Sequence, residues 1–365
     1  MRCSDLRVRL LAVVSATTLA TMSVAACGSD SSTGTGAQSD AADERADGGG
    51  DETFGFPTDS PVAETSSFDS AGDERPPSIR RPFLVGSSLR SARSQARADW
   101  SAARLREDDD DAFGLDAGIA GELAKAWLTD GLEEHASIAA FARFTMMLLS
   151  VAAPPELVAA SQRASLDEIA HARDCFALAR RYGAPDAGPG ALDVHDALGP
   201  GPRSLADLAA LTAEEGCVGE TLGAALAVEQ LAVAVEPAVR RVLARIVRDE
   251  ARHAELAWRF IAWAVAEEQR GALGAAGVSA AVAEAAAHAI AATRAMEIRP
   301  AASDLASWHA HGRLTCSEAR EASERAIVDV VMPCLEALGL RSYQPATPDV
   351  RSAASERTAC SRLQG

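Results

Sequence analysis

Two ten-residue stretches decide the fold of this chain: residues 163–172 read RASLDEIAHA and residues 245–254 read RIVRDEARHA. The second stretch repeats the Arg, Asp, Glu, His and Ala of the first at a constant displacement of 82 residues. A proline repeats at the same displacement, as Pro155 and Pro237. Self-similarity at a fixed spacing indicates that one structural unit occurs twice.

Each repeat unit is predicted to be a helical hairpin, because the apolar residues around it recur with a helical period. A proline is tolerated in the first turn of a helix, and the Gly- and Pro-rich residues 183–203 are long enough to cross a bundle. We therefore expect an all-α protein with a four-helix bundle made of two repeat-related hairpins. Its helices are expected at about 118–150, 155–183, 205–234 and 237–270. Further helices are expected at about 278–297 and 317–332, the latter ending before Pro333.

The repeat places a carboxylate and an imidazole together in each half. Only two of the seven histidines, His171 and His253, have a glutamate three residues before them, Glu168 and Glu250. Residues i and i+3 lie on one face of a helix, and the other residues on these two faces are mostly apolar. Both Glu-x-x-His pairs are therefore predicted to point into the bundle.

The other two helices each offer a carboxylate on an apolar face. Glu133-Glu134 recurs as Glu214-Glu215, and Glu134 and Glu215 each align with apolar residues of their helix. Four carboxylates and two imidazoles inside a bundle would be strongly unfavourable without cations. Two divalent metals would cancel four carboxylates, and this donor set without thiolate suits iron or manganese better than copper(I), although zinc also binds such sites.

The ligand on the third helix has an alternative. Glu220 lies five residues after Glu215, about 140° around an α-helix. Glu215 precedes Glu250 by 35 residues, close to the 34 residues between Glu134 and Glu168, whereas Glu220 precedes it by 30. The sequence favours Glu215 and leaves Glu220 open.

These motifs resemble the ferritin-like di-iron carboxylate proteins, in which two helices each give a Glu and two others each give a Glu-x-x-His. The resemblance covers about residues 118–270. It implies that Glu168 and Glu250 bridge two metals and that each His binds one metal. It also implies that Glu134 and Glu215 are terminal ligands. Asp167 and Asp249 are candidates for orienting the histidines.

The second motif, Asp249-Glu250-Ala251-Arg252-His253, matches the Asp-Glu-x-Arg-His form of di-iron oxygenases in full, whereas the first has Ala170 in place of Arg. The resemblance implies two iron ions, with manganese possible, and an oxidase, oxygenase or peroxidase that uses O₂ or peroxide on an unknown substrate. A metal-binding or ferroxidase-type iron-handling protein and a non-catalytic structural bundle are the alternatives. Whether the chain is an enzyme is open at this stage.

Charge argues against a nucleic-acid partner. The chain of 365 residues carries 52 acidic and 35 basic side chains, a net charge of −17, whereas binding phosphate backbones requires clustered positive charge. Residues 28–79 hold 12 acidic residues against two arginines and almost no apolar periodicity. Such a segment cannot bury enough surface to offset chain entropy, so most of the excess acid is predicted to lie in a disordered tether.

The N-terminus is predicted to be an export signal, because Arg2, Arg7 and Arg9 precede a short apolar stretch. Its end, Val24-Ala25-Ala26-Cys27, resembles a bacterial lipobox, which implies lipidation of Cys27, a membrane anchor and an extracytoplasmic location in the cell envelope. The expected organisation is a signal peptide (1–26), a tether (27–79), an arm packing on the bundle (80–117), the bundle (118–270), a C-terminal helical extension (271–343) and a flexible tail (344–365).

Overall fold

The computed structural model describes residues 81–86, 88–101, 115–199, 204–295 and 304–340, together with Asp5, Val8 and Leu10. Most of these residues are helical, which confirms the prediction of an all-α protein. Cys27, the predicted tether and the predicted tail lie outside the described residues. Of the predicted signal peptide the structure describes only Asp5, Val8 and Leu10, all helical, and Leu10 is buried.

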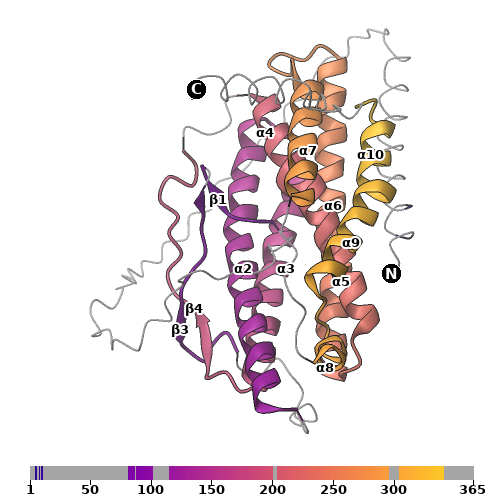
Figure 1. The fold of residues 1–365 in the computed structure, drawn as a ribbon. Coiled ribbons are helices and arrows are strands. Elements are labelled where there is room, and N and C mark those ends of the chain that lie inside the picture. The colour runs from indigo at the N-terminus through magenta and orange to yellow at the C-terminus, as the bar shows by residue number, and fades with distance from the viewer. Residues whose placement is uncertain are drawn as a thin grey trace, which may run out of the picture.

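The first repeat unit is a helical hairpin of α2 (Ala117–Ser150) and α3 (Pro155–Arg181), which pack along each other (Figure 1). Asp116 caps α2 by accepting a hydrogen bond from the backbone N–H of Gly118. Pro155 opens α3, and Gly183 follows its end with a φ of 96°, a left-handed conformation that favours glycine. Both helices therefore begin and end within about two residues of their predicted bounds.

The second repeat unit pairs a segmented helix with α6 (Pro237–Gln269). The segmented helix consists of α4 (Leu205–Thr212), the π-helical η2 (Ala213–Glu220) and α5 (Thr221–Val233). It begins at Ser204, whose hydroxyl and backbone N–H form a capping box with Asp207. The predicted helices at 205–234 and 237–270 are confirmed, but the π-helical middle of the first was not predicted.

Helices of the C-terminal extension cover the second hairpin (Figure 1). They are α7 (Val278–Arg294), α8 (Leu305–Ala310), α9 (Cys316–Ala326), η3 (Ile327–Val331) and α10 (Met332–Ala337). The prediction that the last helix ends before Pro333 is wrong. The π-helical η3 ends at Val331, and α10 follows it directly. Pro333 lies in the first turn of α10, where the missing N–H of a proline is tolerated.

The N-terminal arm lies along α2 beside the connection between the two hairpins (Figure 1). Its strands β1 (Leu84–Val85) and β2 (Ser88–Leu89) pair with each other. Strand β3 (Ser94–Ala96) pairs antiparallel with β4 (Ala187–Pro189), which follows α3. Phe83 is fully buried against Ala136 and Ala140 of α2. Phe83 thus attaches the described part of the arm to α2, and β3 attaches it to the strand that follows α3.

A polar band divides the interior into two apolar cores. On α2, Trp127 belongs to one core and Phe141 to the other, and Glu134 is buried between them. On α6, Val247 and Ala251 belong to different cores and flank Glu250. The fold therefore surrounds its buried carboxylates with apolar side chains on both sides.

Candidate metal centre

The structure brings buried glutamates and histidines together in two groups that could hold metal ions. One group comprises Glu134, Glu168, His171 and Glu250, and the other comprises Glu220, Glu250 and His253. Within each group the ligand atoms lie within 4.8 Å of one another, and Glu250 belongs to both. Each of the six side chains is buried, with the residue at most 3% exposed.

Four helical segments supply these residues. Glu134 comes from α2, Glu220 from the last position of η2, and each Glu-x-x-His pair from the middle of α3 or α6. The spacing of three residues places each pair on one helix face, as the sequence predicts. The two hairpins therefore contribute to one cluster rather than to separate sites.

Glu215, which the sequence favoured as the ligand of the third helix, belongs to neither group. Its Oε1 accepts a hydrogen bond from Arg143 Nη2 at 2.8 Å, and its Oε2 lies 3.6 Å from Nε of Arg81. Glu220, the alternative, lies beside Glu250 and His253. The set of donors is thus corrected to include Glu220 in place of Glu215.

The physical reason for this correction is the π-helical segment. In an α-helix residues five apart differ by about 140° in direction, so Glu215 and Glu220 could not both face the interior. In a π-helix the hydrogen bonds run from i to i+5 and each turn holds more residues, so residues five apart point in more similar directions than in an α-helix. Both carboxylates are buried, 2% and 1% exposed, but Glu215 contacts Arg143 and Arg81, whereas Glu220 lies beside Glu250 and His253.

Both histidines present Nδ1 to the carboxylates. His171 Nδ1 lies 3.8 Å from Glu168 Oε2 and 3.6 Å from Glu250 Oε1. His253 Nδ1 lies 3.1 Å from Glu168 Oε1 and 3.9 Å from Glu250 Oε1. Each oxygen of Glu168 therefore faces a different histidine, and Oε1 of Glu250 lies near both.

Asp167 and Asp249 bind the Nε2 atoms of the two histidines, and each aspartate binds the histidine of the other hairpin. His171 on α3 bonds through Nε2 to Asp249 of α6 at 3.0 Å, while His253 on α6 bonds through Nε2 to Asp167 of α3 at 3.3 Å. An aspartate on the outer nitrogen fixes the ring orientation and the tautomer. Because each aspartate serves the histidine of the other hairpin, these bonds also connect α3 to α6.

One arginine serves both aspartates. Arg252 Nη2 lies 2.9 Å from Asp167 Oδ2 and 2.8 Å from Asp249 Oδ1, and its side chain is about half exposed. Its counterpart in the first repeat is Ala170. The departure of the first motif from the Asp-Glu-x-Arg-His form thus has a structural explanation, since a single guanidinium already bridges both carboxylates.

The charges in the cluster compensate one another without a metal. Burial raises the pKa of Glu168, but the close imidazoles of His171 and His253 outweigh it and lower the pKa to about 2. Burial lowers the pKa of His171, but the hydrogen bond with Asp249 and the nearby carboxylate of Glu168 raise it to about 9, and similar contacts raise the pKa of His253. Burial also raises the pKa of Glu220. A metal ion would therefore have to displace protons from the imidazoles.

Several inward-facing atoms of the cluster have no hydrogen-bond partner among the residues that the structure describes. They are Glu168 Oε2, His171 Nδ1, Glu220 Oε1, Glu250 Oε2 and His253 Nδ1. Buried polar atoms are costly when they have no hydrogen-bond partner. These atoms are carboxylate oxygens and imidazole nitrogens, and within each group they lie close enough together to bind one ion. The donor set fits divalent cations such as iron(II), manganese(II) or zinc(II).

Sequence reasoning missed the two arginines that hold Glu215. Arg143 is on α2 and Arg81 is on the arm, and both are buried. The sequence predicted an arm on the bundle from residue 80 onward, but no spacing connects residue 81 with residue 215. Of the other residues near the centre, Cys175 is fully buried, and the ring of His135 packs edge-on against Trp100 of the arm at 5.3 Å.

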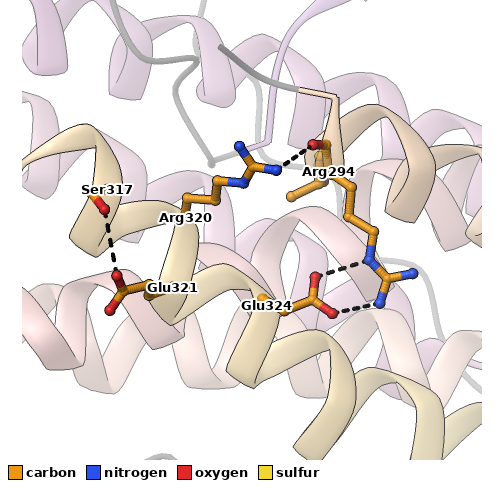
Figure 2. A pocket seen from close by; sticks show the side chains of 6 residues that line it. Arg294, Ser317, Arg320, Glu321 and Glu324 are labelled. Carbon is orange, nitrogen blue, oxygen red and sulfur yellow. Dashed lines mark hydrogen bonds and ion pairs between the residues drawn. The ribbon is translucent and has the colours of Figure 1, made fainter. Parts of the chain in front are cut away.

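A pocket of about 450 Å³ opens elsewhere, between the end of α7 and α9 (Figure 2). Arg294 donates hydrogen bonds of 2.9 and 2.6 Å to Glu324. Arg320 donates to the backbone carbonyl of Arg294 at 3.2 Å. None of the residues that line this pocket belongs to the two groups that could hold metal ions.

No family model, curated protein or solved structure matches the chain. Within the described residues, no helix is both long and apolar enough to cross a membrane. The geometry of the buried cluster is therefore the basis for a functional proposal.

Proposed function

We propose that this protein binds a dinuclear metal centre, with iron as the resident metal, inside a ferritin-like four-helix bundle. The observation that carries the proposal is that two groups of buried donors share Glu250. Two divalent cations would balance the carboxylates of Glu134, Glu168, Glu220 and Glu250. The long connection between two antiparallel hairpins supports the ferritin-like arrangement.

The contacts suggest a role for each donor. Glu250 and Glu168 would be shared by the two metals, because Glu250 belongs to both groups and the two oxygens of Glu168 face different histidines. Glu134 and His171 would hold one metal, and Glu220 and His253 would hold the other. Asp249 and Asp167 keep Nδ1 of each imidazole directed inward by accepting from Nε2.

We propose further that the centre serves an oxidase or oxygenase that consumes O₂ or peroxide. Two bound irons would supply the two electrons that reductive activation of O₂ requires. The chain's own contribution is to hold six donors in a dry environment, because the apolar cores on both sides exclude water. The ring of Phe141, 5.0 Å from that of His253, is part of this wall.

Anaerobic loading with iron(II) tests the proposal. The wild-type chain should bind two irons, and exposure to O₂ or peroxide should give a coupled diferric centre in optical and Mössbauer spectra without mineral growth. Continuous uptake of many irons would instead support an iron-storing protein. Binding of fewer than two metals would contradict the dinuclear centre. His288→Gln, on the surface with its side chain 74% exposed, is the matched control for His171→Gln and His253→Gln.

We also propose that the mature chain is anchored to the cell envelope through a lipid on Cys27. The proposal is supported by the lipobox-like sequence that ends at this residue. Mass spectrometry of the N-terminal peptide should show a lipidated cysteine, and Cys27→Ser should move the protein out of the membrane fraction. An unmodified Cys27 in the membrane-bound protein would contradict it.

A further inference from the structure

A charged side chain of the N-terminal arm is buried among the helices, close to the metal centre. The guanidinium of Arg81 lies 4.6 Å from the ring centres of both Phe141 and Phe144. The hydroxyl of Ser137 on α2 donates to the backbone carbonyl of Arg81 at 2.9 Å. The side chain of Arg81 is 1% exposed, so its charge requires a compensating partner inside the protein.

That partner is Glu215 of η2. Its two oxygens face different arginines, with Oε1 bonded to Arg143 and Oε2 near Arg81. Arg143 also donates to the backbone carbonyl of Leu84, which belongs to the arm. Arm, α2 and η2 are therefore joined around one buried carboxylate.

The position of Glu215 determines the direction of Glu220. The two residues are the third and the last of the π-helical segment, five residues apart, and the π-helical turn brings their directions closer together than an α-helix would. If the segment relaxed to α-helical hydrogen bonding while Glu215 kept its place, the larger angle between residues five apart would turn Glu220 away from the cluster. Holding Glu215 against two arginines favours the π-helical form.

We propose that Arg81 is a positioning residue: through Glu215 it keeps η2 in the π-helical form that directs Glu220 at Glu250 and His253. The metal position that contains Glu220 thus depends on the docking of a segment more than 130 residues earlier in the chain. Arg81 itself touches neither metal group. This inference rests on the proposed dinuclear centre for its consequence, but its structural part holds for the metal-free protein.

Hydrogen–deuterium exchange of the metal-free chain tests the structural part. Arg81→Ala should raise the exchange of backbone amides in Ala213–Glu220 by at least tenfold and leave those around Glu168 unchanged. The matched control is Arg90→Ala, which removes an arm arginine that pairs with Asp193 at the surface. Unchanged exchange in η2 of Arg81→Ala would overturn the proposal.

Metal stoichiometry tests the consequence. If the wild type binds two metals, Arg81→Ala should bind one, with the site of Glu134 and His171 retained, while Arg81→Lys should keep both because it preserves the charge beside Glu215. Two metals at wild-type affinity in Arg81→Ala would refute the inference. If Arg81→Ala does not fold, Glu215→Gln takes its place, because it removes the charge that the arginines hold and keeps the side-chain size.

The two tests separate the inference from the proposed function. A wild-type chain that fails to bind two metals contradicts the dinuclear centre, yet the exchange experiment still decides whether Arg81 holds η2. A wild type with two metals and an Arg81→Ala variant with two metals contradicts only the role of Arg81.

Discussion

The two hairpins have the same motif but hold their carboxylates differently. In the first, Glu134 lies on an uninterrupted α-helix of 34 residues, and the helix period alone directs it inward. In the second, Glu220 ends a π-helical segment that must be kept out of α-helical phase. The comparison teaches that a repeated motif need not be supported by a repeated scaffold.

The largest effect should follow from removing the donor that the two groups share. Glu250→Ala should abolish binding of both metals, because Glu250 belongs to each group, whereas Glu134→Ala should remove one. Metal per chain, measured after anaerobic loading with iron(II), distinguishes the two. Glu214→Gln, a half-exposed acid on η2, is the control and should keep two. Retention of two metals in Glu250→Ala would show that the halves bind independently.

Asp249 and Asp167, which each hold the histidine of the other hairpin, should contribute differently to metal affinity. Asp249→Asn should weaken metal binding by about 10–100-fold, the usual effect of removing the partner of a ligand histidine. Asp167→Asn should cost less, because its bond to His253 is longer at 3.3 Å and its side chain is 23% exposed against 8% for Asp249. Titration with manganese(II) measures both affinities. Equal losses would mean that the two hairpins orient their histidines equally.

A pair of glycines compares the packing of the two hairpins. A Cβ on Gly216 of η2 would lie 2.6 Å from Cβ of Ala257, which is fixed to the α6 backbone. Gly216→Ala should therefore destabilise the protein by about 1–3 kcal/mol. A Cβ on Gly131 of α2 would meet the ring of Phe176 at 3.0 Å, and this ring can shift by a few tenths of an ångström.

Gly131→Ala should consequently be close to neutral, since alanine also favours the helix by about 1 kcal/mol over glycine. Urea unfolding of the two metal-free variants measures the difference. Equal free energies of unfolding for the two variants would show that η2 can move away from α6 without loss of stability, and that the short distance between Gly216 and Ala257 is not needed.

The smallest effect is expected at the surface arginine that bridges the two halves. Arg252→Ala should lower the free energy of unfolding by no more than about 1 kcal/mol, because its guanidinium is about half exposed and its ion pairs are screened by solvent. The same substitution should lower the metal affinity beside His171 and beside His253 by a similar, small factor. A large loss confined to one position would show that Arg252 supports only one aspartate.

Much of the architecture could be predicted from residue spacing. Prolines at the starts of α3 and α6, Ser204 at the start of α4 and Gly183 after α3 act locally, so their effects appear in the sequence. The inward direction of both Glu-x-x-His pairs also followed from the helix period, because α3 and α6 are regular α-helices.

The choice between Glu215 and Glu220 could not be read in the same way. A π-helical turn adds one residue and shifts the phase of every residue after it. The glycines of η2, Gly216 and Gly219, do not by themselves distinguish such a turn from an α-helix. The turn is favoured by Arg81 and Arg143, whose approach to Glu215 depends on the docking of the arm. Long-range contacts of this kind leave no periodicity.

The sequence by itself determined the helices, the repeat and the type of donor, because these depend on side-chain chemistry and on spacings of three to seven residues. Tertiary structure alone decided which glutamate of the third helix reaches the centre, which aspartate holds which histidine, and why one arginine suffices for both. Each of these depends on the distance between groups on different helices, and that distance is established only when the two hairpins and the arm pack together.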